Sequence, residues 1–132
     1  MVEENSGQVL RRSIGIVFSD GGLLALNAER PKAAEGHGEE SIRAILCDPD
    51  GAPVEISETL LSTEYGADGV QRRAMLELWA HDEDRQPLRG AGRLISAAEV
   101  RKPGAVSEVA FFRWSLEGRE GLGHYELVRA DG

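Results

Sequence analysis

The feature that most constrains the fold of this chain is a series of turn signals with short apolar segments between them. Turn signals recur about every 10 to 20 residues, and SDGG, DPDG and GADG contain Asp-Gly or Gly-Gly pairs. Glycine supplies the positive φ that tight hairpin turns require, and aspartate is common beside it. Segments this short leave little room for long helices, so the pattern predicts antiparallel strands joined by hairpins.

The apolar residues within the segments favour the same interpretation. Ile14, Ile16 and Phe18 fall on alternate positions, and alternate residues of a strand share one face. The segments EESIRAIL and QRRAMLELWA also fit helical spacing, but each ends at an Asp-rich turn, so we interpret both as strands. The one helical turn that we predict is SAAEV, residues 96–100. Residues 27–38, polar and containing a proline, are predicted to form a long loop.

These observations predict one all-β domain spanning residues 1–132, an antiparallel meander of seven or eight strands. The ribbon of hairpins is expected to curve into a barrel or half-barrel, and a two-sheet sandwich is the nearest alternative. A chain of 132 residues is long enough to bury one core. Residues 1–7 and 130–132 are expected to be mobile tails.

The charge balance bears on the classes of partner. The chain has 23 acidic and 15 basic side chains, a net charge of −8, which repels nucleic-acid phosphates and anionic lipid heads. We therefore predict no nucleic-acid partner and no membrane association, and we interpret the paired arginines of RRSIGIV and VQRRAML as solvated strand-end charges. The polar start predicts no signal peptide, and the lone Cys47 cannot form an internal disulfide, so a cytoplasmic location is expected.

The C-terminal stretch EGREGLGHYELV contains three closely spaced glycines. Gly118, Gly121 and Gly123 give the spacing G-x-x-G-x-G, which is not the dinucleotide-binding order, and a predicted strand follows them in place of a helix. Glycine within a strand commonly marks a bend or a close approach of two backbones. We interpret these glycines as structural.

The same stretch carries a family resemblance. LEGREGLGHYELV, preceded by VSEVAFFRWSL, resembles the closing hairpin of lipocalin-like domains in the hydroxyneurosporene synthase (carotenoid hydratase) and AttH-type superfamily. The matching residues are Gly118, Arg119, Gly121, Gly123 and Glu126, although the tyrosine here precedes the glutamate. The resemblance covers about the last two thirds of the chain and implies a lipocalin-like barrel. Larger members of the family carry two such domains, and this chain has room for one.

Carboxylates and aromatic side chains share the predicted strand faces. Glu108 is in phase with Phe112 and Trp114, and Glu58 lies among apolar residues of its own segment. Apolar walls with a few orienting polar groups are typical of small-molecule sites. We therefore predict a ligand-binding site inside the barrel formed by Glu58, Trp79, Glu108, Phe112 and Trp114. In the alternative interpretation, the two glutamates lie at strand ends in water.

The histidines offer little for a metal centre. His37, His81 and His124 lack the close spacing of a zinc site, and Cys47 belongs to no Cys-x-x-Cys pair. We predict no metal and no cofactor, and a His/Glu centre assembled from separate strands is the weaker alternative. Catalytic residues are not identified, since the chain also lacks a G-x-S-x-G nucleophile motif.

Three functions are compatible with these features. The leading one is binding of a small apolar or amphipathic molecule in the barrel. The resemblance implies a second, a hydratase- or isomerase-type enzyme acting on an unsaturated terpenoid-like substrate, with a buried carboxyl as proton donor. The third is a non-catalytic structural or assembly module. Phe111 must point opposite to Phe112, and with Val109 it predicts an exposed apolar strip and a homodimer.

Overall fold

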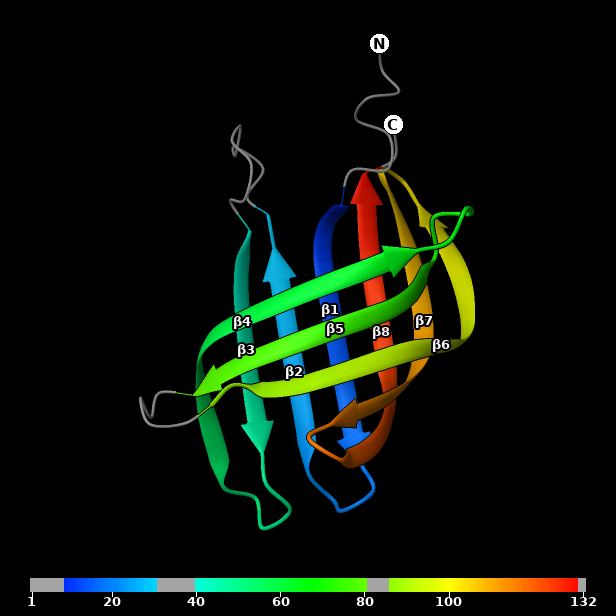
Figure 1. The fold of residues 1–132 in the computed structure, drawn as a ribbon. Coiled ribbons are helices and arrows are strands. Elements are labelled where there is room, and N and C mark those ends of the chain that lie inside the picture. Colours follow the sequence, from blue (N-terminus) through cyan, green and yellow to red (C-terminus); the bar gives the residue numbers. More distant parts are fainter. Residues whose placement is uncertain (1–8, 31–39, 81–85, 131–132) are drawn as a thin grey trace.

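The structure, a computed structural model, describes residues 9–30, 40–80 and 86–130. It is an all-β domain whose eight antiparallel strands close into a barrel in chain order (Figure 1). The strands are β1 (Val9–Phe18), β2 (Leu23–Glu29), β3 (Ser41–Cys47), β4 (Pro53–Tyr65), β5 (Gln71–Ala80), β6 (Leu88–Lys102), β7 (Ala105–Leu116) and β8 (Arg119–Ala130). Pairing of β1 with both β2 and β8 closes the barrel. The predicted meander barrel is thus confirmed.

Both segments with ambiguous periodicity are strands, β3 and β5, as predicted. In β5, Ala74, Leu76 and Leu78 are buried while Met75 is 64% exposed, which is the two-residue alternation of a strand with one face in a core. In Figure 1, β4, β5 and β6 cross in front of β1, β2 and β3. The inward faces of these strands can therefore pack against each other.

The predicted helical turn at residues 96–100 is wrong, because these residues belong to β6. They pair in continuous register with β7, from Ser96 opposite Phe111 to Val100 opposite Ser107. Gly104, with a φ of 82°, makes the turn between the two strands. Cross-strand pairing outweighs the local helix preference of SAAEV.

Three other predicted boundaries change or lie outside the described residues. The predicted loop 27–38 begins later, because residues 27–29 extend β2 in register with β1 and β3; residues 31–38 are not among those described. The turn DEDRQ falls mostly outside them too, as do residues 1–7 and 131–132. Ala130 pairs with Ala105 at the end of β8. The β7–β8 turn contains only Glu117 and Gly118, both with positive φ, as in a type I′ hairpin.

The core lies inside the barrel and is built from inward-facing residues of the strands. Its largest fully buried side chains include Trp114, Tyr125, Phe18 and Phe112. Close contact between β1 and β8 depends on glycine, because a Cβ on Gly123 would overlap the backbone oxygen of Gly15. The structural interpretation of the C-terminal glycines is therefore confirmed at this position.

Candidate functional site

The five predicted ligand-binding residues do not form one site. Phe112 and Trp114 are buried in the core with their ring centroids 5.1 Å apart, and Glu108 also faces the interior. Trp79 and Glu58, however, are a cross-strand pair on the exposed outer face of β5 and β4. The expectation that Trp79 forms part of an interior wall is wrong, since Leu78 takes the inward position at that point of β5.

Glu58 points outward because of an irregularity that the sequence did not indicate. The β4–β5 register shifts between Ile56 and Glu58, as at a β-bulge. A bulge adds one residue to a strand and so exchanges the two faces beyond it. Thr59 consequently takes the buried position, and Glu58 lies among exposed residues.

Glu108 belongs to a polar cluster at the end of the barrel where β8 ends. Its Oε1 lies 3.6 Å from Nε of Arg129. The fully buried Gln71 donates a hydrogen bond from Nε2 to the backbone oxygen of Tyr125 at 2.8 Å. The hydroxyl of Tyr125 is 2.6 Å from that of Thr63, and burial raises the pKa of Tyr125. This cluster closes the polar end of the core, although Gln71 Oε1 and Glu108 Oε1 are buried there without a hydrogen-bond partner among the described residues.

A second ion pair completes the polar end. Arg12 donates from Nε and Nη2 to the two carboxylate oxygens of Glu40, at 3.0 and 2.5 Å. Such fork-to-fork pairing fixes both groups. Glu40 and Glu108 therefore each lie beside an arginine. A nearby arginine favours the charged form of a carboxyl, whereas the enzymatic alternative needs a protonated one.

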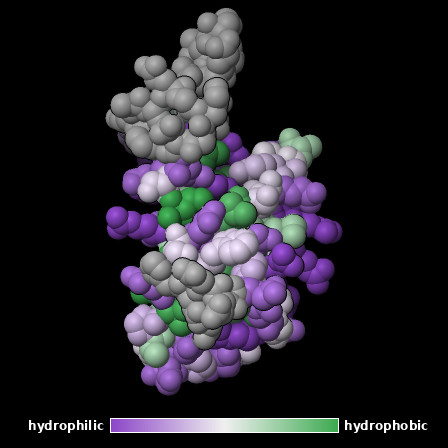
Figure 2. All heavy atoms as spheres, turned by 60° about the vertical axis from the view of Figure 1, so that its left-hand side comes forward, coloured by the Kyte–Doolittle hydropathy of each residue, from purple (hydrophilic) through white to green (hydrophobic). Residues whose placement is uncertain are grey.

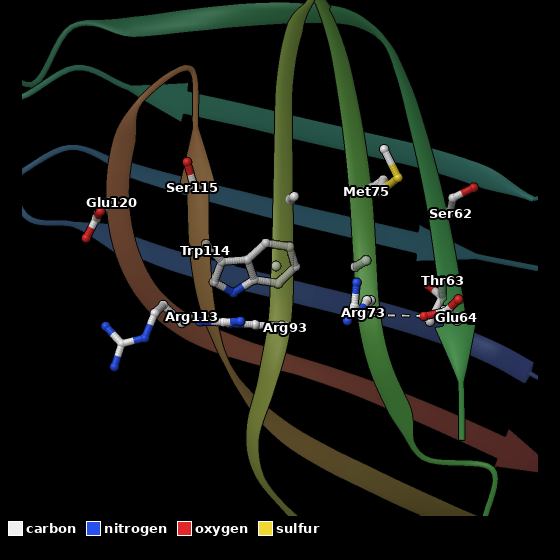
Figure 3. A pocket seen from close by; sticks show the side chains of 13 residues that line it. Ser62, Thr63, Glu64, Arg73, Met75, Arg93, Arg113, Trp114, Ser115 and Glu120 are labelled. Carbon is white, nitrogen blue, oxygen red and sulfur yellow. Dashed lines mark ion pairs between the residues drawn. The ribbon is translucent and has the colours of Figure 1, made fainter. Parts of the chain in front are cut away.

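A concavity lies on the outside of the barrel, over β4 to β7 and the start of β8 (Figure 3). This hollow has a volume of about 780 Å³. Most of its lining residues are exposed ones of the outer face, and the rest are the residues beneath them. They are Ser62, Thr63, Glu64, Arg73, Ala74, Met75, Ala91, Gly92, Arg93, Arg113, Trp114, Ser115 and Glu120.

The strand register explains how residues so distant in sequence meet. Ser62, Met75, Ala91, Ser115 and Glu120 are successive cross-strand partners from β4 to β8 and form one row across the sheet. We call this row the Met75 row. Met75 and Ala91 make the middle of the row apolar. Because the side chain of Ala91 is small, the surface is hollowed at that point.

The inward side chains directly beneath the hollow are small. Ala74 and Gly92 occupy inward positions of β5 and β6 with little or no side chain. A Cβ on Gly92 would overlap the indole of Trp114, so the ring packs directly under the backbone of β6. Trp114 is thus the one predicted ligand-binding residue that also lines the hollow.

A second row borders the hollow and is cationic. Glu64, Arg73, Arg93 and Arg113 are successive cross-strand partners, two residues along each strand from the Met75 row. Arg73 Nε lies 3.8 Å from Glu64 Oε1. We call Arg73, Arg93 and Arg113 the arginine row; Figure 3 shows them on three neighbouring strands.

Sequence reasoning missed the arginine row and Met75. The doublet of Arg72 and Arg73 was interpreted as a solvated strand end, and Arg93 and Arg113 lie in segments 20 residues apart. Only the register between β5, β6 and β7 places them side by side. The sequence offered one indication: Arg113 is two residues from Phe111 in the same predicted strand, so it was expected on the same outward face.

Beyond the Met75 row, the outer face carries apolar side chains beside an ion pair of Glu77 with Arg89, 3.2 Å apart. Leu60 on β4 and Trp79 on β5 are both exposed and lie two and four residues farther along their strands. The face therefore changes from cationic at Arg73 to a mixture of apolar side chains and one ion pair toward Trp79. Six residues of strand separate these two ends, about 20 Å at roughly 3.4 Å per residue.

Comparison with known proteins adds no assignment: no family model and no curated protein matches the chain. In residues 9–30, 40–80 and 86–130, no group of three His, Cys, Asp or Glu side chains is placed to hold a metal ion. The same residues include no helix with the length and apolarity needed to cross a membrane. His124 is exposed on β8, whereas His37 and His81 fall outside the described residues.

Proposed function

We propose that this protein is a binding module for a small amphipathic molecule, held in the outer hollow of β4 to β7. The observation that carries this proposal is the hollow of about 780 Å³ around Met75, a residue that is 64% exposed. Small-molecule sites commonly have volumes of roughly 300–1,000 Å³. A large exposed apolar side chain in such a hollow is suited to contact a ligand.

The ligand class is the one predicted from the sequence, but the site differs. Interior space is taken by core side chains such as Phe112 and Tyr125, which are fully buried and in mutual contact. On the outside, Met75 and Ala91 provide apolar contact and the arginine row provides polar contact. Trp79 can cover an apolar tail that extends past Met75. The resemblance to lipocalin-like domains and the cytoplasmic location, with which the free Cys47 is compatible, remain predictions.

The test is methionine methyl NMR on the full chain, because Met1 and Met75 are its two methionines. Protein labelled with 13C at the methionine methyl groups is titrated with decanoate, n-decanol and decyltrimethylammonium, each below the concentration at which it forms micelles. We expect at least one compound to shift the Met75 signal saturably. If no compound moves it, the proposal is wrong.

A space-filling variant locates the effect. Ala91→Phe places a ring in the hollow beside Met75 and should abolish the saturable shift, since the ligand and the ring would need the same volume. Ala98→Phe is the matched control, an exposed outer-face alanine of the same strand that does not line the hollow. Unchanged binding by Ala91→Phe would place the ligand elsewhere.

We also propose that the protein forms a homodimer through a second outer surface. Leu122, Val17 and Leu23 are successive partners on β8, β1 and β2, and Phe111 and Ile45 lie in the next row. All five are at least 42% exposed. β3 is on the side brought forward in Figure 2, where hydrophobic residues are visible between hydrophilic ones.

The occupant of this apolar surface is a second copy of the chain. A two-fold interface must be complementary to itself, and an uncharged patch meets that requirement without matched charges. Two chains of net charge −8 repel each other most weakly where such a patch forms the contact. This surface adjoins the hollow, because Leu122 is the cross-strand partner of Arg113, which lines the hollow.

A further inference from the structure

The arginine row is an electrostatic anomaly. Arg73, Arg93 and Arg113 are directly opposite one another on three neighbouring strands, and all three are exposed. Residues in such positions have Cβ atoms about 4.5–5.5 Å apart, and like charges there destabilise a sheet. The chain has 15 basic and 23 acidic residues, so three arginines in one row are not the result of a general excess of basic side chains.

The neighbouring protein groups compensate little of this charge. Glu64 lies next to Arg73, at 3.8 Å and with both side chains more than 70% exposed, so the pair is weak. At the other end of the row Arg113 faces Leu122, which is apolar. Within the described ranges, no carboxylate forms an ion pair with Arg93 or Arg113. The row therefore presents about two uncompensated positive charges.

The uncompensated charges lie at the edge of the hollow. All three arginines line it, and the Met75 row is about 7 Å away along the strands. A guanidinium binds carboxylate, phosphate and sulfate groups through paired N–H donors. An anionic group on the row would remove the like-charge repulsion and would direct an attached chain over Met75.

We infer that the ligand of the hollow is an anionic amphiphile, with its carboxylate, phosphate or sulfate group on the arginine row and its aliphatic chain over Met75. This inference rests on the proposed function and names the class of ligand. Glu120 at the far end of the Met75 row and Glu64 at the end of the arginine row disfavour a second anionic group at either place. The ligand thus carries one anionic head.

The test compares compounds that share a ten-carbon chain. Affinities of the full-length protein for decanoate, decyl phosphate, n-decanol and decyltrimethylammonium are measured by the Met75 methyl shift. We expect the two anions to bind at least tenfold more tightly than n-decanol, and the cation to bind most weakly. Raising the salt concentration should weaken decanoate binding and leave n-decanol binding nearly unchanged, since salt screens exposed charges.

Substitutions test whether the preference for anionic compounds comes from the arginine row. Arg93→Gln should lower decanoate affinity about tenfold without changing n-decanol affinity. Arg101→Gln is the matched control, because Arg101 is exposed on the same strand, pairs with Glu99 and does not line the hollow. Both variants replace exposed side chains, and their unfolding curves establish that they fold.

The outcomes separate this inference from the proposed function. Equal affinity for n-decanol and the anions would overturn the anionic class while leaving the hollow as a site. An anion preference that survives in both Arg93→Gln and Arg113→Gln would also overturn it. Inorganic phosphate binding as tightly as decyl phosphate would contradict the amphiphile, whereas no binding of any compound would remove the proposed function itself.

Discussion

At the scale of single residues, Tyr125 links the two environments inside the barrel. Its ring contacts Phe112 and Trp114, with centroids 5.6 and 6.4 Å away, and its hydroxyl reaches the polar end at Thr63. Burial favours the neutral phenol, so the pKa of Tyr125 is raised above its ordinary value of 10.0. Folding therefore becomes coupled to pH in the alkaline range.

The sign of this coupling gives a prediction. A group whose pKa is higher in the folded than in the unfolded state contributes stability below its unfolded pKa, and that stability is lost as the pH rises through the folded pKa. Wild-type stability should therefore fall above about pH 10. Tyr125→Phe should cost about 0.5–1.5 kcal/mol at pH 8, by loss of the hydroxyl's hydrogen bond. The variant should also lose less stability above pH 10.

Urea unfolding followed by tryptophan fluorescence between pH 8 and pH 11 measures both effects. Thr63→Val is a suitable control, because it removes the same hydrogen bond and leaves the titrating phenol in place. A Tyr125→Phe curve parallel to that of the wild type at alkaline pH would show that Tyr125 is not the group responsible.

Residue-level sequence reasoning succeeded where one strand determines the answer. The alternation of β8 placed Gly123, Tyr125 and Leu127 together on one face, and in the structure these three are buried. It failed for Glu58, since a bulge in β4 depends on pairing with β5 and leaves no distinct composition. Trp79 was misplaced for a different reason: its strand has apolar residues on both faces, so the pattern did not identify the inner one.

At the scale of strands, the arginine row implies a measurable instability of the ligand-free sheet. Replacing the central Arg93 by glutamine removes its charge repulsion with Arg73 and Arg113. The free energy of unfolding should therefore rise by about 0.2–1 kcal/mol at low salt. Added salt should stabilise the wild type more than the variant, because it screens the same repulsion. Urea denaturation of both proteins at low and high NaCl concentration measures this difference. Equal salt dependence of the two would contradict the uncompensated row.

The strand-level fold could be predicted because turn chemistry is local. Asp-Gly and Gly-Gly pairs mark the β1–β2, β3–β4 and β4–β5 connections, and the apolar alternation between them gives the strands. The candidate site could not be predicted in this way, because it depends on which residues of neighbouring strands are opposite one another. The Met75 row draws one residue from each of five strands, and a shift of one residue in any register would move that residue to the other face.

At the scale of the whole molecule, two outer surfaces of different character adjoin each other and meet where Arg113 is opposite Leu122. The arginine row and the hollow occupy β4 to β7, and the apolar surface of Val17, Leu23, Ile45, Phe111 and Leu122 occupies β1 to β3 with β7 and β8. A closed meander allows this division, since the outer face of each strand is free once the inner face forms the core.

The proposed dimer has a test of its own. The protein should have twice the chain mass in sedimentation velocity, and Val17→Asp should shift it to monomer, because Val17 is 65% exposed at the centre of the apolar surface. Ala98→Asp, which adds the same charge at an exposed position of β6, should leave the dimer intact. A wild-type monomer at all accessible concentrations would contradict the assembly proposal and leave the ligand proposal untouched.

The central claim is that this barrel binds its ligand on its outer wall, above a filled core. A crystal structure with 10-bromodecanoate tests it most directly, because anomalous scattering locates the bromine and so the end of the chain. The claim predicts the carboxylate at Arg93 and Arg113 and the chain running over Met75 toward Leu60. A bromine peak inside the barrel, among Phe112, Trp114 and Tyr125, would contradict it.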